Sequence, residues 1–213
     1  HLVTRFMDDV IDMNNYPLSK IEKMTKGNRK IGIGVMGWAD MLVLLGIPYN
    51  SDEALELAEV LMEFISYYSK LYSVELAKER GPFPNFDLSL WKTDIADKIY
   101  DKEDSRLNWA ELREKIKKYG IRNATTTAIA PTGTIAVIAN ASHGIEPYFA
   151  LVYERRTPTF TLYESNPHFE KIAKERGFYS EELMKALSKT FSIQHIEEIP
   201  EDIKKIFITA HDL

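Results

Sequence analysis

The sequence predicts a helix-rich α/β fold, and three observations support this prediction. Apolar side chains between Leu55 and Leu76 recur at helical spacing, which indicates a long helix with one buried face. A β-branched segment that begins at Thr125 leads into a Pro-Thr-Gly-Thr turn and a short apolar run, which is typical of strand, turn and helix. Two further segments within 148–163, rich in β-branched and aromatic residues, predict strands on either side of a turn.

Helices are expected wherever helical spacing coincides with a start or stop signal. Ser51, Asn108 and Ser180 are good N-caps, Pro167 suits a first helical position, and a glycine such as Gly120 indicates a helix end. The expected helices occupy 2–13, 19–26, 29–46, 51–80, 90–100, 108–118, a segment that starts at 166, 180–188 and 200–210. We therefore expect 1–120 to be mainly helical, 121–165 to hold strands and a loop, and 166–213 to be helical.

The composition fits a globular domain and excludes several classes of protein. Hydrophobic residues make up 45% of the 213 residues, enough for a sizeable core. The net charge is -5, so no basic surplus points to nucleic acid or to an anionic membrane surface. No apolar run reaches the roughly 18 residues that span a bilayer. No signal peptide follows His1, so a cytoplasmic location is expected, and a start at histidine suggests a single fragment, 1–213, of a larger domain.

The absence of cysteine limits the chemistry that this chain can perform. Disulfides, thiolate metal sites and a cysteine nucleophile or thiyl radical are excluded within the chain. No two of the five histidines lie three or four positions apart, the spacing that places two metal ligands on one helix face. We therefore expect no metal site.

Gly32-Ile-Gly34-Val-Met-Gly37 matches the letters of a dinucleotide-binding fingerprint but not its context. That fingerprint follows a buried strand and is completed by an acidic residue about 20 positions later, at the end of a second strand. Here the preceding segment, 26–30, is polar, and the acidic residues at that distance, Asp52 and Glu53, begin the long helix. Close packing of helices explains the glycines better, because glycine lacks a Cβ.

The segment Pro131-Thr132-Gly133-Thr134-Ile135 is the strongest candidate for a binding site. A turn that leads into a helix exposes backbone N–H groups without internal partners, and the helix dipole favours negative charge there, so the turn suits a phosphate. It is not a Walker loop, because no Gly-Lys-Ser/Thr follows to supply a lysine and a magnesium ligand. On the residues alone, an ordinary turn between a strand and a helix remains the alternative.

Two other polar features are weaker candidates. Glu146 lies between Ile145 and Pro147, where a surface or hydrogen-bonding role is the ordinary interpretation and a supporting chemical role is the alternative. The pair Arg155-Arg156 has the charge to clamp an anion, but a solvated pair at a strand end is the preferred interpretation.

Several short motifs follow one another along nearly the whole chain: Asn28–Asp40, Leu45–Tyr49, Glu79–Pro84, Arg122–Thr125, Ile129–Ile135, Gly144–Pro147, Asn166–Phe169, Ser192–Gln194 and Phe207–Asp212. In this order they resemble the large, catalytic subunit of ribonucleotide reductase. One such motif would be weak evidence, whereas the ordered set is strong. The loop Ala-Pro-Thr-Gly-Thr-Ile and the Thr-Ala-His-Asp near the end are most similar to the adenosylcobalamin-dependent class.

The resemblance implies a ten-stranded α/β barrel, of which this chain forms an incomplete part from the second half. It also implies that Pro131–Ile135 holds the distal phosphate of a ribonucleotide. Backbone N–H groups of 132–135 and the hydroxyls of Thr132 and Thr134 would donate to that phosphate, and Gly133 would allow its close approach. Family members often carry a hydroxyl residue where this chain has Ile135, so here that position would contribute its N–H alone.

The resemblance further implies a ribonucleoside-diphosphate reductase, which makes 2′-deoxyribonucleotides for DNA synthesis by radical chemistry. Adenosylcobalamin would supply the radical in the full enzyme, with none bound by this chain. The family's reaction depends on an Asn-x-Cys-x-Glu motif and two further cysteines, so we expect no catalytic residue in this cysteine-free chain. The expected partners are a ribonucleoside di- or triphosphate and the remainder of the barrel, within a homodimeric enzyme.

A stand-alone helical module that keeps phosphate binding without catalysis is the alternative function, and the absence of cysteine fits it equally well. The two hypotheses differ in whether an Asn-x-Cys-x-Glu motif is encoded with this segment.

Overall fold

The computed structural model describes residues 1–93, 95, 105–156 and 161–213. These residues form two compact units, and each unit is assembled from two separate stretches of chain. Unit 1 comprises 1–34 and 58–129, and unit 2 comprises 35–57 and 130–213. None of the described helices combines the length and the apolar character that crossing a membrane requires.

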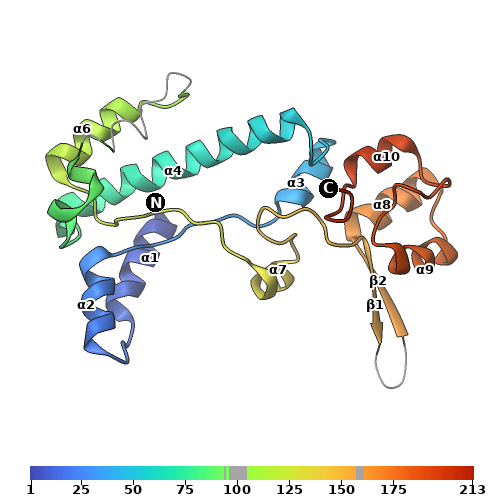
Figure 1. Cartoon of the computed structure of the whole chain (residues 1–213), viewed down its shortest axis with the longest axis horizontal. Coiled ribbons are helices and arrows are strands. Elements are labelled where there is room, and N and C mark those ends of the chain that lie inside the picture. The colour runs from blue at the N-terminus through green and yellow to red at the C-terminus, as the bar shows by residue number, and fades with distance from the viewer. Residues whose placement is uncertain (94, 96–104, 157–160) are drawn as a thin grey trace. The chain divides into compact units, whose positions relative to one another are not determined.

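Unit 1 is built mainly from helices in the part of the chain that the structure describes. They are α1 (Leu2–Met13), α2 (Ser19–Asn28), most of α4 (Asp52–Arg80), the short 3-10 helices η1 (Phe86–Leu88) and η2 (Leu90–Lys92), and α6 (Trp109–Tyr119) (Figure 1). The helices predicted at 2–13, 19–26, 51–80 and 108–118 are confirmed. Of the helix predicted at 90–100, η2 occupies the first turn, and residues 94 and 96–100 lie outside the described residues.

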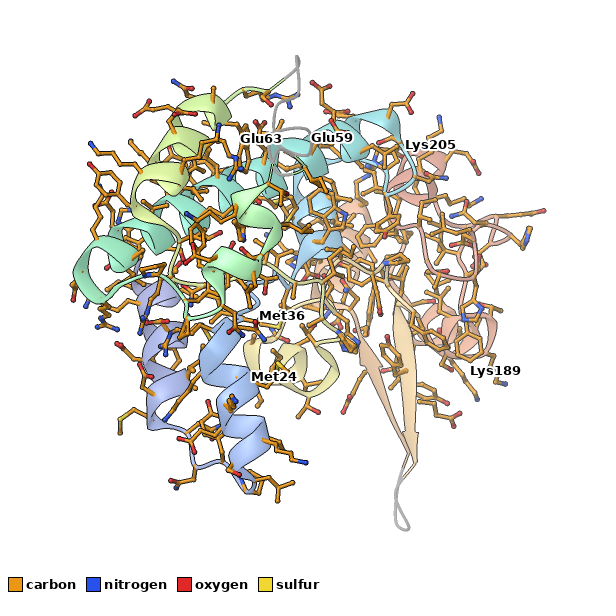
Figure 2. All side chains as sticks on the ribbon, turned by 60° about the vertical axis from the view of Figure 1, so that its left-hand side comes forward. Met24, Met36, Glu59, Glu63, Lys189 and Lys205 are labelled. Carbon is orange, nitrogen blue, oxygen red and sulfur yellow. The ribbon has the colours of Figure 1, made fainter. Side chains whose placement is uncertain are left out.

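The core of unit 1 lies where α4 packs with α6 and the segments that follow them. Glu63 of α4, labelled in Figure 2, accepts a hydrogen bond from Nε1 of Trp109 in α6 at 3.0 Å. The ring of Trp109 meets that of Tyr67 edge to face, with 5.3 Å between the ring centres. The buried apolar side chains of this core are Tyr67, Val74, Phe83, Phe86, Trp91, Trp109, Leu112, Ile116 and Ile121.

The prediction of one helix over 29–46 is wrong in its first half. Residues 29–37 are not helical, and a helix begins only at Trp38. The backbone N–H of Ile33 donates instead to the carbonyl of Thr126, at 2.9 Å. A Cβ on Gly32 would lie 2.7 Å from Cβ of Ala128, and one on Gly34 would lie 2.6 Å from the Ala128 carbonyl oxygen. The glycines therefore permit two extended segments to approach each other, not the helix packing that the sequence suggested.

The strand predicted from Thr125 is also wrong as a regular strand. It forms one isolated parallel bridge, between Thr127 and Ile33. The β-branched residues favour an extended backbone here, but a strand also needs a continuous ladder of partners, and this pairing does not continue past Gly34 in the described structure.

Unit 2 combines helices with a small sheet. Its helices are α3 (Trp38–Leu45), the start of α4, α7 (Gly133–Ala139), α8 (Pro167–Arg176), α9 (Glu181–Thr190) and α10 (Glu201–Ile206). The predicted pair of strands is confirmed as β1 (Val152–Arg156) and β2 (Thr161–Ser165), which run antiparallel with Val152 opposite Ser165. Helix α9 contacts both strands of this hairpin (Figure 1).

The helices after the hairpin begin where the sequence predicted. The side chain of Asn166 caps α8 by accepting from the N–H groups of His168 and Phe169, both at 3.0 Å. The hydroxyl of Ser180 caps α9 by accepting from Leu183 N at 3.0 Å. Helix α10 is shorter than the predicted 200–210, because Thr209 forms a parallel bridge with Tyr148.

A second hydrophobic core belongs to unit 2. Phe169 and Phe207 are fully buried at its centre and meet edge to face, with 5.3 Å between the ring centres. The buried members of this core are Ala39, Val43, Tyr148, Leu151, Val152, Phe169, Leu183, Met184, Leu187, Ile193, Ile199, Ile203 and Phe207. Each unit therefore has a core of its own.

Candidate functional site

The segment Pro131–Ile135, called the candidate loop from here on, leads into α7 of unit 2. Thr132 is the N-cap residue and Gly133 is the first residue of the helix. The first helical hydrogen bond runs from Ala136 N to Thr132 O, at 2.8 Å. The N–H groups of residues 133–135 precede that bond and so have no acceptor within the helix. Residues 131 and 133–135 are exposed, so a ligand has access to these donors.

The hydroxyl of Thr132 is oriented by a residue that lies further along the chain. Its Oγ1 accepts a hydrogen bond from the backbone N–H of Gly144, at 2.7 Å. Because the oxygen is the acceptor in that bond, the hydroxyl hydrogen is directed elsewhere and can donate to an anion. The donor role that the resemblance implies for Thr132 stays a prediction.

The two glycines of this region differ in what the fold requires of them. Gly144 is buried and has a φ of +50°, and a Cβ there would lie 3.2 Å from the Ala130 carbonyl oxygen. Gly133 is different, because a Cβ on it would meet no atom within 4 Å. The fold therefore favours glycine at 144, whereas at 133 the space in front of the backbone is open to a ligand.

The start of α3 holds the segment that carries Gly144. The N–H of Gly37 donates to the carbonyl of Ser142 at 2.9 Å. The carboxylate of Asp40 accepts from the N–H of Ser142 at 2.6 Å, and the Ser142 hydroxyl accepts from the N–H of Asp40 at 3.3 Å. The first turn of α3 and residues 142–144 therefore satisfy each other's polar groups.

The other oxygen of the Asp40 carboxylate faces Tyr148 and His168. The Tyr148 hydroxyl donates to Oδ1 of Asp40 at 2.5 Å, and Nε2 of His168 lies 3.8 Å from the same oxygen. Burial raises the pKa of Tyr148 far above its ordinary value, and the hydrogen bond to Asp40 raises it further. Tyr148 is therefore a neutral hydroxyl that donates to Asp40 across the physiological pH range.

The sequence alone did not point to Asp40, Ser142 or Tyr148 as parts of this region. Asp40 lies 102 positions from Ser142 and 108 positions from Tyr148, so no local pattern links them. Asp40 does fall in the motif Gly37-Trp-Ala-Asp40, and an acidic residue in the first turn of an apolar helix is the signal that was available.

Glu146 is exposed and lies two residues after Gly144. Its backbone N–H donates to the carbonyl of His143 at 2.9 Å, which closes a turn. The hydroxyl of Tyr49 donates to the carbonyl of Ile145 at 2.8 Å. Burial raises the pKa of Tyr49, and the charge of Glu146 raises it further. The structure thus brings Glu146 into the segment that contacts the candidate loop through Gly144, and its chemical role stays a prediction.

The remaining candidates lie elsewhere. Arg155 and Arg156 belong to β1, and the interpretation of this pair as solvated stays a prediction. Among the residues that the structure describes, no three histidine, aspartate or glutamate side chains gather to hold a metal ion.

The sequence matches a known protein family over its whole length. The sequence model of the family described as "Ribonucleotide reductase, barrel domain" matches residues 1–213. A protein of Thermoplasma acidophilum named "Vitamin B12-dependent ribonucleoside-diphosphate reductase" is 47% identical over 211 residues, which are 99% of this chain and 24% of that protein. A protein of the same name from Mycobacterium tuberculosis (strain CDC 1551 / Oshkosh) is 38% identical over 100% of this chain and 27% of that protein.

The chain is also similar to a reductase that carries a different name. The "Ribonucleoside-diphosphate reductase large subunit" of Caenorhabditis elegans is 34% identical over 100% of this chain and 27% of that protein. The chain therefore spans about a quarter of the length of these relatives.

Proposed function

The chain belongs to the ribonucleotide reductase family, and from that premise we propose that it is part of a vitamin B12-dependent ribonucleoside-diphosphate reductase. Such an enzyme reduces ribonucleotides to 2′-deoxyribonucleotides. The match of the family's barrel domain to every residue of the chain carries this proposal. In the whole enzyme, we place these residues in the wall of a ten-stranded α/β barrel, within a cytoplasmic homodimer.

The proposed task of this segment is to hold the phosphates of the substrate. The N–H groups of residues 133–135 would donate to a phosphate, as donors at the start of a helix do. The Thr132 hydroxyl would add a donor, because Gly144 already occupies its oxygen. Thr134, two residues further on, is exposed and would supply a second hydroxyl. The relatives named as diphosphate reductases favour a ribonucleoside diphosphate over the triphosphate.

The catalytic cysteines are assigned to other parts of the enzyme, because this chain contains no cysteine, and the cofactor is assigned there with them. When bound, adenosylcobalamin supplies the radical that starts the reaction. Every buried side-chain nitrogen or oxygen in the described part of the chain has a hydrogen-bond partner, so none is left over for a ligand. In this proposal, the residues of this chain bind the substrate phosphates.

Variants of Gly133 and Thr132 in the full-length reductase test the phosphate site. Gly133→Val is expected to weaken binding of a ribonucleoside diphosphate about tenfold or more, because its side chain would fill the open space. Thr132→Val is expected to weaken binding as well, whereas Thr132→Ser keeps the hydroxyl and serves as the matched control. Isothermal titration calorimetry measures each affinity, and the unphosphorylated ribonucleoside is the control ligand. An unchanged diphosphate affinity in both valine variants contradicts the assignment.

The alternative of a non-catalytic phosphate-binding module is tested separately. The enzyme proposal requires that the same gene, or a companion gene, encodes an Asn-x-Cys-x-Glu motif. Its absence from both would favour the module.

A further inference from the structure

The carboxylate of Asp40 in unit 2 accepts a hydrogen bond on each of its two oxygens. Oδ2 of Asp40 accepts from the backbone N–H of Ser142, and Oδ1 accepts from the hydroxyl of Tyr148. The Asp40 side chain is 17% exposed, so both bonds are largely shielded from water. Hydrogen bonds to a charged acceptor are about twice as strong as those between neutral groups. Asp40 therefore fixes residues 142 and 148 more firmly than a neutral side chain would.

The segment that Asp40 holds also carries the group that orients Thr132. Gly144 lies two residues after Ser142, and its N–H donates to Thr132 Oγ1 at 2.7 Å. The carbonyl of Gly144 accepts from the N–H of Trp38, at 3.5 Å, so the first turn of α3 holds this residue from its other side. Two hydrogen bonds, joined by the backbone of residues 142–144, thus connect Asp40 to the candidate loop.

We propose that Asp40 is a positioning residue for substrate phosphate, and this inference rests on the proposed function of the candidate loop. By fixing Ser142, the carboxylate fixes Gly144, and Gly144 occupies the oxygen of Thr132. The hydroxyl hydrogen of Thr132 then points to the ligand before the ligand arrives. Asp40 makes no contact with the phosphate in this scheme. Its negative charge is satisfied by the N–H of Ser142 and the hydroxyl of Tyr148.

Removal of the charge should therefore change substrate binding more than it changes turnover. In Asp40→Asn, one oxygen becomes an NH₂ group, so at most one of the two donors keeps its acceptor, and that acceptor is neutral. Residues 142–144 are then held less firmly, and Thr132 samples orientations that do not point to the phosphate. We expect KM for a ribonucleoside diphosphate to rise about tenfold, which corresponds to about 1.4 kcal/mol, while kcat changes less than about twofold.

The experiment measures KM and kcat for a ribonucleoside diphosphate in the full-length reductase, with its cofactor and reductant supplied. Asp202→Asn is the matched control, because it makes the same chemical change at an exposed ion pair with Arg176 in the same unit. A thermal melt of each variant reports whether it folds. Binding of the unphosphorylated ribonucleoside reports on the rest of the substrate site and should be equal in both variants.

Ser142→Ala provides a second test in case Asp40→Asn does not fold. It removes the hydroxyl that accepts from Asp40 N but leaves the N–H that donates to Asp40. We expect a smaller rise in KM with the same sign, about threefold. The proposal is overturned if KM is unchanged in Ser142→Ala and Asp40→Asn either leaves KM unchanged, lowers kcat by as large a factor as it raises KM, or does not fold.

The outcomes also separate this inference from the proposed function. If Thr132→Val and Gly133→Val weaken diphosphate binding while Asp40→Asn and Ser142→Ala behave like Asp202→Asn, the phosphate site stands and the role of Asp40 is wrong. If the two valine variants bind the diphosphate normally, the phosphate site itself is wrong. A rise in KM for Asp40→Asn and Ser142→Ala, with nucleoside binding unchanged, supports both.

Discussion

The carboxylate of Asp8 is fully buried in unit 1, and its Oδ1 lies 2.8 Å from Nε of Arg29. Nε of Arg122 and Nη1 of Arg80 lie 3.2 and 3.3 Å from the other oxygen. The amide of Asn123 donates to Oδ1 at 3.0 Å. One buried carboxylate thus joins α1 to three arginines that come from distant parts of the chain.

Loss of the Asp8 carboxylate should be strongly destabilising. In Asp8→Ala, the guanidinium of Arg29, which is 4% exposed, keeps its charge but loses its most buried partner. We expect the free energy of unfolding to fall by about 3–5 kcal/mol, as for other broken buried ion pairs. Urea unfolding measures the change. Asp87→Ala is the control, because Asp87 pairs with Lys92 on the surface and its loss should have little effect.

Stability should fall in acid because of the same cluster. The hydrogen bond from Arg29 lowers the pKa of Asp12. Burial alone would raise the pKa of Asp8, but its hydrogen bonds and charge interactions with Arg29 and Arg122 outweigh burial and lower it. A group whose pKa is lower in the folded state stabilises the fold above its unfolded pKa of about 4, and that stability is lost as the pH falls towards the folded value.

Melting temperatures between pH 3 and pH 7 check this acid dependence. In Asp12→Asn, the acid part of the curve should be shallower than in the native protein. Asp12 is about half exposed, so the change is expected to be modest. A curve parallel to that of the native protein would contradict the contribution of Asp12.

A methyl group at position 34 should disrupt the approach of residues 31–34 to residues 125–128. The Cβ in Gly34→Ala would lie 2.6 Å from a backbone carbonyl oxygen, so one of the two segments must move. We expect a loss of about 1–3 kcal/mol in the free energy of unfolding. Gly133→Ala is the matched control, because its Cβ meets no atom, and its stability should stay within about 1 kcal/mol of the native value. Equal stability of the two variants would contradict the packing described for Gly34.

The cap of α9 gives a further test. Ser180→Ala removes the acceptor for Leu183 N and should cost about 1 kcal/mol. Ser180→Asp keeps an acceptor and adds a negative charge at the start of the helix, so it should retain the native stability. Chemical denaturation of both variants distinguishes the loss of the cap from a general effect of substitution at this position.

The features that the sequence predicted well depend on near neighbours. Asn108 and Ser180 cap helices through N–H groups three residues away, and Pro167 begins a helix by its own geometry. The helix–turn pattern at the candidate loop is equally local, so its position at the start of α7 was predictable. The regular strand expected before it was not confirmed, because strand pairing depends on a partner that no local pattern specifies.

The features that the sequence did not reveal depend on contacts between distant residues. Gly32 and Gly34 lie in an apolar stretch with small residues, which suits a helix, and only the approach of Ala128 explains the extended form. Asp8 and Arg122 are 114 positions apart, and Asp40 and Ser142 are 102 positions apart. Local propensity carries no information about such pairs, so the anchoring of the candidate loop could be seen only in three dimensions.

The stretches of chain that form the two units alternate along the sequence, and this affects how the chain folds during synthesis. Residues 35–57 are synthesised early, but the core of unit 2 also needs side chains from 148–207. The core side chains of 35–57 therefore stay exposed until those later residues follow. Unit 1 has all of its residues once position 129 has left the exit tunnel. We therefore expect unit 1 to fold first during synthesis, so that α4, whose first residues belong to unit 2, packs at its C-terminal end before its N-terminal end.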